Sequence, residues 1–212
     1  MGKRLGRRRL YALEKKGQTV TGSVGRGVSG SLVSRTVSRD GQRIITDIVI
    51  DAGSSVGALY AAGTRHHVVG HTGSAFGDDV AVATAYPAHF GEIDAVTNGI
   101  VDLVEVTVVE GFTGSQDLAA QRFCLKHHTT ATLHFSSSGG TVFANLGNLA
   151  TLGSSSAFDI DDNSLNGKYL YLARDGATNG SPVVASSNTG LGALSAGKIL
   201  IRLHGVAVPE SL

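Results

Sequence analysis

Residues 90–109 read FGEIDAVTNGIVDLVEVTVV and carry the strongest local folding signal in this 212-residue sequence. The pair Asn98-Gly99 is typical of the two central positions of a type I′ turn, where both residues need positive φ. We therefore predict a β-hairpin whose arms are residues 90–97 and 100–109. In the second arm three valines alternate with polar residues, as expected for a strand with one buried face.

Other segments share this strand character, with β-branched residues and alternating apolar and polar side chains. These predicted strands are Arg43–Ile50, His67–His71, Asp79–Ala85, Thr129–Phe135, Lys168–Ala173 and Lys198–Val208. Glycine-bearing turns separate them, in a chain with 29 Gly, 3 Pro and no Trp. About eight short strands joined by such turns predict an all-β fold, a jelly-roll-like antiparallel β-sandwich over residues 40–212.

Charge divides the chain into two parts. Residues 1–43 hold eleven Lys/Arg and two Asp/Glu, giving +9, whereas residues 44–212 hold seven Lys/Arg and fifteen Asp/Glu, giving −8. A basic segment beside an acidic body indicates that the segment meets an anionic surface, either nucleic acid or the acidic face of a neighbouring subunit. We expect residues 1–39 to form a basic N-terminal arm and a Gly/Ser-rich linker that gains order only against a partner.

The start of this arm, residues 1–18, reads MGKRLGRRRLYALEKKGQ and combines cations with apolar side chains. A short helix there is marginal alone, because its few hydrogen bonds do not offset nucleation. The apolar residues favour a tether that orders on a protein surface over a solvated tail, and contact with nucleic-acid phosphates stays open. The candidate partner-binding residues are Lys3, Arg4, Leu5, Arg7, Arg8, Arg9, Leu10, Tyr11 and Leu13.

Two kinds of polar cluster could be considered as ion sites. The histidines gather in two places, His66, His67 and His71 in one and His127 and His128 in the other. On a strand, His67 and His71 would lie roughly 13 Å apart, too far to share one ion. Residues 159–163 (DIDDN) resemble the start of a calcium loop but lack its Gly at position six and its Glu at position twelve. We therefore predict surface or strand-edge histidines and a turn, with no metal site and no cofactor.

Motifs of the common enzyme classes are incomplete or missing in the sequence. The spacing GxSxG occurs once, in residues 53–57 (GSSVG), but no helix is predicted after it, as the nucleophile elbow requires. The sequence contains no Walker loop, no HExxH and no GxGxxG after a predicted strand. The lone Cys124 excludes an intrachain disulfide and is expected to be a small buried residue. No apolar run approaches the ~20 residues of a membrane span, and no apolar segment follows the N-terminal arginines as in a secretory signal. We expect a protein that is not an enzyme and contacts no membrane.

Three stretches resemble a family of tailed-bacteriophage virion structural proteins found among marine phages and cyanophages. They are MGKRLGRRRLYALEKKG at residues 1–17, SRDGQRIITDIVIDAG at residues 38–53 and GKILIRLHGVAVPESL at residues 197–212. The resemblance implies a capsid decoration or cement protein, β-rich, multimeric and attached by an extended arm. It carries over no catalytic residues.

The resemblance and the charge division lead to one functional hypothesis with rivals. In this hypothesis the β domain sits outside the shell as a symmetric homo-oligomer, and residues 1–40 anchor it to the major capsid protein or other virion proteins. Its location would be the virion, assembled in the host cytoplasm. The rivals are a tail, nozzle or fibre-associated virion protein, a DNA-binding virion protein that uses the basic arm, and a carbohydrate-active enzyme.

Overall fold

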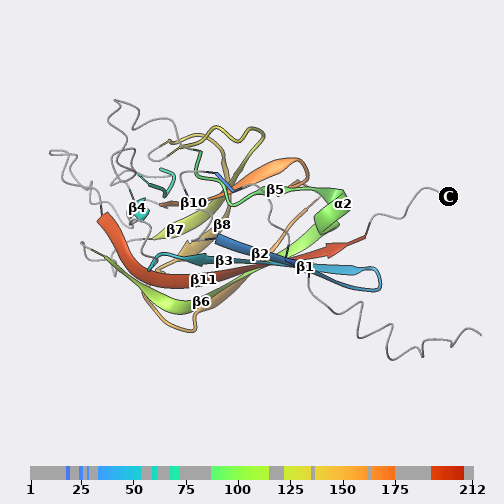
Figure 1. Ribbon diagram of the computed structural model, residues 1–212, viewed down its shortest axis with the longest axis horizontal. Coiled ribbons are helices and arrows are strands. Elements are labelled where there is room, and N and C mark those ends of the chain that lie inside the picture. Colours follow the sequence, from blue (N-terminus) through green and yellow to red (C-terminus); the bar gives the residue numbers. More distant parts are fainter. Residues whose placement is uncertain are drawn as a thin grey trace, which may run out of the picture.

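The computed structural model describes residues 18–19, 24–25, 28, 33–53, 59–61, 67–71, 87–114, 122–134, 137–161, 164–174 and 192–207. Within these residues the chain is mostly β-strand, arranged as two antiparallel sheets in two layers (Figure 1). The prediction of an all-β, antiparallel fold is therefore confirmed. No helix in the described part of the chain is long and apolar enough to cross a membrane.

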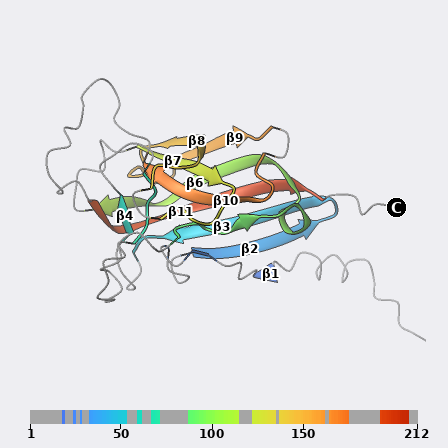
Figure 2. The same cartoon turned by 90° about the horizontal axis from the view of Figure 1, so that it is seen from above.

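The larger sheet, sheet A, has the strand order β1-β2-β3-β11-β6-β9, and β4 pairs with the beginning of β11. Its long strands run side by side in the view of Figure 2. The strands are β1 (Gln18–Thr19), β2 (Val33–Asp40), β3 (Arg43–Asp51), β4 (Leu59–Ala61), β6 (Ile100–Gly114), β9 (Ser155–Asp159) and β11 (Gly192–Val206).

The smaller sheet, sheet B, has the order β5-β10-β7-β8 and lies over one face of sheet A (Figure 1). Its strands are β5 (Glu92–Ile93), β7 (Phe123–His128), β8 (Thr141–Gly147) and β10 (Lys168–Arg174). A single helical turn, α2 (Ala95–Asn98), connects β5 in sheet B to β6 in sheet A.

The hydrophobic core fills the space between the two sheets. On β6, Val104, Val106 and Val108 are 0%, 3% and 2% exposed, as their alternation predicts. Ile199 and Ile201 of the neighbouring β11 lie on the same face, and both are 0% exposed. Each such side chain contributes about 1.5–3 kcal/mol when it leaves water, so this face fixes the register of the central strands.

The predicted hairpin of residues 90–109 is wrong in its first arm. β5 pairs with β10, not with β6, and the chain then forms α2. Asp94 caps the helix because its side chain accepts a hydrogen bond from the Val96 N–H, while Gly99 ends it with φ 73°. The positive φ expected at Gly99 is present, but it serves a helix C-cap instead of a two-residue turn. An N-cap aspartate followed by a C-cap glycine is the signal that the hairpin reading overlooked.

Of the other strand predictions that fall on described residues, three are confirmed and two are wrong. Arg43–Ile50, Lys168–Ala173 and Lys198–Val208 correspond to β3, β10 and β11, although β11 begins at Gly192. Thr129–Phe135 is not a strand where described, since β7 ends at His128 and residues 131–132 form a turn. At 67–71 the described chain forms no strand and has isolated bridges at Val68, which pairs with Ala173, and at Gly70. The predicted strand Asp79–Ala85 lies outside the described residues.

The beginning of the β fold lies further toward the N-terminus than the predicted boundary at residue 40. β2 occupies Val33–Asp40 and pairs along its whole length with β3. Val28 is 0% exposed in the core, and Gln18–Thr19 pair with β2. The segment expected to be a linker therefore contributes to sheet A, because alternation in residues 33–37 buries Val33, Arg35 and Val37 against the core.

Candidate interaction surface

Two faces of the molecule point away from the core, and they differ in what lies over them. On sheet B, the Tyr171 hydroxyl donates to the Thr130 carbonyl oxygen at 3.0 Å, and Lys126 Nζ donates to the Ser138 carbonyl oxygen at 2.7 Å. The described segments that contain Thr130 and Ser138 therefore pass over the outward face of this sheet. Burial raises the pKa of Tyr171 to about 12. The outward side chains of Tyr171 and Lys126, on the two middle strands of sheet B, are thus covered.

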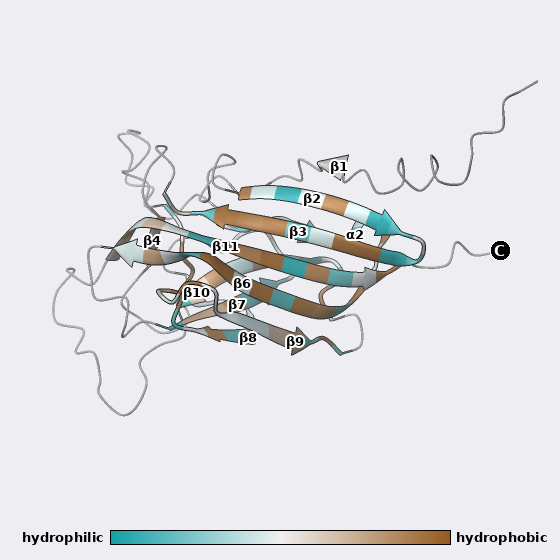
Figure 3. Cartoon of the chain, turned by 90° about the horizontal axis from the view of Figure 1, so that it is seen from below, coloured by the Kyte–Doolittle hydropathy of each residue, from teal (hydrophilic) through white to brown (hydrophobic). Residues whose placement is uncertain are grey.

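No described element lies over the outward face of sheet A, which is turned to the viewer in Figure 3. We call this surface the open face and define it by outward positions of β2, β3, β11, β6 and β9. Their register brings residues of distant sequence side by side, because β11 pairs with β3 on one edge and β6 on the other. Its outward residues are Ser34, Thr36, Ser38, Asp40, Arg43, Ile45, Asp47, Val49, Asp51, Leu103, Glu105, Thr107, Val109, Glu110, Ser155, Ala157, Asp159, Lys198, Leu200, Arg202, His204 and Val206.

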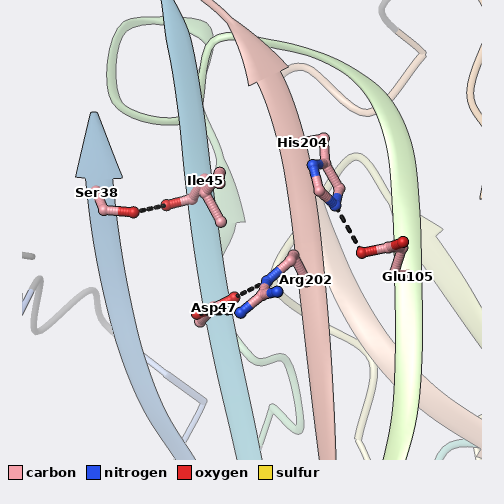
Figure 4. A network of polar contacts seen from close by, with 6 residues as sticks. All are labelled: Ser38, Ile45, Asp47, Glu105, Arg202 and His204. Carbon is pink, nitrogen blue, oxygen red and sulfur yellow. Dashed lines mark hydrogen bonds and ion pairs between the residues drawn. The ribbon is translucent and has the colours of Figure 1, made fainter. Parts of the chain in front are cut away.

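The central strand of the open face holds cations between two acidic strands. Arg202 lies directly opposite Asp47 of β3 and contacts it twice, Nε–Oδ1 at 2.8 Å and Nη2–Oδ2 at 3.1 Å (Figure 4). The hydrogen bond that Arg202 donates to Asp47 raises the pKa of Arg202. Near the other end of β11, Lys198 Nζ lies 2.8 Å from Asp51 Oδ2, and this hydrogen bond holds the pKa of Asp51 below its usual value.

On the β6 side, His204 Nε2 lies 2.8 Å from Glu105 Oε2 (Figure 4). This contact is diagonal, because the register places Arg202 opposite Glu105 and His204 opposite Leu103. In the same view the Ser38 hydroxyl donates to the Ile45 carbonyl oxygen at 3.4 Å. The polar contacts therefore extend across β2, β3, β11 and β6.

Carboxylates outnumber cations on the open face. Six outward carboxylates, Asp40, Asp47, Asp51, Glu105, Glu110 and Asp159, stand against three cations, Arg43, Lys198 and Arg202, giving −3 with His204 neutral. Among the described residues, Glu110 and Asp159 make no ion pair, and both are exposed. Apolar side chains lie between the charges, with Val109 48% exposed. A surface of this kind accepts a partner that carries both cations and apolar groups.

A second polar network lies inside the molecule, on the inward face of sheet A. Arg35 is 7% exposed and donates from Nη2 to the side-chain oxygen of Asn98 at 2.8 Å. Asn98 in turn donates to the Thr46 hydroxyl at 2.8 Å and accepts from the Asp94 N–H at 2.9 Å. Burial lowers the pKa of Arg35, partly offset by the nearby acidic Asp94 and Glu92. This network joins β2 and β3 to α2 and has a structural role.

The sequence-predicted binding residues lie outside the described part of the chain. Lys3, Arg4, Leu5, Arg7, Arg8, Arg9, Leu10, Tyr11 and Leu13 all precede Gln18, so their role stays a prediction. His66, Asp162 and Asn163 also lie outside it. In the described residues no group of three or more His, Cys, Asp or Glu side chains could hold a metal ion. His127 stacks on Phe143 with ring centroids 5.8 Å apart, and Cys124 is buried.

The open face was not predicted as a site from the sequence. Its signal is the alternation Lys198, Leu200, Arg202, His204 in the last strand, where cations occupy outward positions. Comparison with known proteins adds no assignment, since no family model, no curated protein and no solved structure matches this chain.

Proposed function

We propose that the two sheets form a jelly-roll sandwich. Support comes from the strand order when the eight main strands are numbered along the chain, omitting β1, β2 and β4. Sheet A then contains the first, eighth, third and sixth strands in spatial order, and sheet B the second, seventh, fourth and fifth. This is the order that two nested Greek keys produce, and jelly rolls recur in viral capsid proteins and lectins.

On this fold we propose a structural role in a virion, as a capsid decoration or cement protein. The observation that carries the proposal is the strand order of the two sheets. The resemblance of residues 1–17, 38–53 and 197–212 to tailed-phage structural proteins points in the same direction. A decoration protein needs a rigid folded body and an attachment that gains strength from many copies on one lattice.

The attachment segment in this proposal is the N-terminal arm, narrowed to residues 1–17. Residues 18–19, 28 and 33–40 already take part in the body, whereas residues 1–17 hold seven Lys/Arg and one Glu, a net charge of +6. The β domain would sit outside the shell as a homo-oligomer. The arm would hold it there through its cations and through Leu5, Leu10, Tyr11 and Leu13.

Binding to DNA-free shells of its own virus tests this role. The full chain is compared with an arm variant, Arg8→Glu with Arg9→Glu, and with a control of equal charge change, Arg122→Glu with Lys168→Glu, at positions of the body outside the open face. We expect saturable binding by the wild type and the control, and loss of binding by the arm variant. Truncation at residue 40 is unsuitable, because it removes β2 from sheet A.

Each of three outcomes would contradict a part of this proposal. Absence of binding by the wild-type chain would exclude decoration and leave a tail, nozzle or fibre-associated position, which a map of the particle would locate. Equal binding by the arm variant would exclude the arm as the anchor. Retention of the wild type on double-stranded DNA at physiological salt, without binding to empty shells, would favour the DNA-binding role.

A further inference from the structure

The open face of sheet A lacks a partner in the described structure, and its composition restricts what the partner can be. It is a broad surface of five strands, about 24 Å across at a strand spacing of about 4.8 Å. Its ion pairs use Asp47, Asp51 and Glu105, while Glu110 and Asp159 lie outside these pairs, with Glu110 opposite Lys198 of β11. A partner with excess positive charge is therefore favoured.

The same face of a second copy does not fit this requirement. The acidic strands β3 and β6 flank the basic positions of β11 on both sides. A two-fold axis along the strands would stack β3 on the β6 of the other copy, and an axis across the strands would stack β3 on β3. Either arrangement places carboxylates against carboxylates, which is unfavourable in a desolvated interface.

The N-terminal segment of the chain does fit. Residues 1–17 have a net charge of +6, and their four large apolar side chains match the apolar positions Ile45, Val49 and Leu200 between the carboxylates. Fully extended, seventeen residues reach about 55–60 Å, more than twice the width of the open face. The length, charge and apolar content of residues 1–17 are thus all sufficient for binding across the open face.

The way in which the chain joins sheet A indicates which copy receives the segment. β1 runs antiparallel to β2, with Gln18 opposite Val37 and Thr19 opposite Thr36. Toward lower residue numbers, the chain therefore points past the Asp40–Arg43 end of its own sheet. A segment that continues in this direction leaves its own body and meets a neighbouring molecule without reversing.

We propose that residues 1–17 of one copy dock on the open face of a neighbouring copy. This inference rests on the proposed function and deepens it, because it names the surface on the decorated shell that receives the arm. The contact is head-to-tail, so it closes into a ring or continues as a chain of copies, depending on the rotation between neighbours. On a shell, linked copies would hold one another in place through avidity.

Self-association of the full chain without shells tests this docking. One variant, Arg8→Glu with Arg9→Glu, lowers the net charge of the arm from +6 to +2, and the other, Glu110→Lys with Asp159→Lys, changes the net charge of the open face from −3 to +1. Sedimentation over a concentration series should give a dissociation constant raised about tenfold or more in each variant. An equimolar mixture of the two variants should form pairs again, because the open-face variant keeps the wild-type arm and the arm variant keeps the wild-type open face.

The controls separate this docking from misfolding and from the shell role. Thr141→Lys with Asn145→Lys adds two cations at exposed positions of β8 in sheet B and should associate like the wild type, and all variants should keep the wild-type melting temperature. No association of the wild type, an unaffected open-face variant, or a mixture that stays dissociated would each overturn the inference. Shell binding that persists while self-association fails overturns only this inference, whereas self-association without shell binding overturns only the proposed function.

Discussion

The guanidinium of Arg35 on β2 donates to the side-chain oxygen of Asn98 at the end of α2, 2.8 Å away and 63 residues along the chain. Both residues are buried, at 7% and 0% exposure. Asn98 also bonds to Thr46 on β3 and to the Asp94 N–H at the start of its own helix. One amide group therefore links sheet A to the connection between the two sheets.

Replacing this amide should be strongly destabilising. Asn98→Ala removes the acceptor from a buried guanidinium and leaves Thr46 and the Asp94 N–H without their partner, so we expect a loss of about 3 kcal/mol or more. Urea unfolding followed by circular dichroism measures the change. Thr97→Ala, on the exposed side of the same turn, removes only a bond to Asp94 and should cost less than about 1 kcal/mol. Equal costs would contradict a structural role of the buried network.

Gly99 provides a second test of this connection. Its φ is 73°, and a Cβ placed there would lie 2.6 Å from the Val206 carbonyl oxygen on β11. Gly99→Ala should therefore cost more than about 2 kcal/mol, combining backbone strain with a steric clash. Gly147 has φ 68° and nothing within 4 Å of such a Cβ, so Gly147→Ala should cost only the strain of about 1 kcal/mol. Equal losses would show that the close approach to β11 is not important.

The strands that sequence predicted best are those in which β-branched residues alternate with polar ones. β3, β6 and β11 have this pattern because one face of each packs on the core, and burial of every second residue requires alternating apolar and polar side chains. β8 (TVFANLG) and β9 (SSAFD), in contrast, lack this alternation of β-branched and polar residues, and pairing with β7 and β6 determines their conformation. Local propensity cannot reveal strands of that kind, because their stability comes from tertiary contacts.

Prediction of functional sites from the sequence has the same limit, as the open face shows. Alternation in residues 198–204 indicates that Arg202 and His204 share a face, but it does not identify their partners. Asp47 lies 155 residues away from Arg202 and Glu105 lies 99 residues away from His204. Only the strand order β3-β11-β6 brings them together, and that order depends on the topology of the whole chain.

The free energy of unfolding should decrease in mildly acidic solution, because burial disfavours the protonated form of several histidines. Burial lowers the pKa of His89, whose ring lies against Tyr169 with centroids 4.9 Å apart. A group whose pKa is lower in the folded state stabilises the fold above its unfolded pKa, about 6.5, and this stabilisation is lost as pH falls toward the folded value. Burial lowers the pKa of His67 and His127 in the same direction.

His89→Phe keeps a ring beside Tyr169 but removes the titrating group. The free energy of unfolding of the wild type should therefore decrease from about pH 7.5 to about pH 5, and that of His89→Phe should decrease less. Urea unfolding at the two pH values measures both decreases. An identical decrease in the two proteins would mean that His89 does not contribute to the acid sensitivity.

The ion pair between Arg202 and Asp47 should be weak, because both side chains are about a third exposed, at 39% and 32%. A double-mutant cycle of Arg202→Gln and Asp47→Asn should give a coupling energy of about 0.5–1 kcal/mol that decreases at high salt. The control cycle pairs Arg202→Gln with Asp51→Asn, whose Cα atom lies roughly 13 Å further along β3 than that of Asp47, and should give little coupling. A coupling well above 1 kcal/mol that salt does not reduce would mean that water is excluded from the open face. No described element covers this face. Strong, salt-independent coupling in the self-associated protein, together with weak coupling in the variant Arg8→Glu with Arg9→Glu, would therefore locate the docked arm over Arg202.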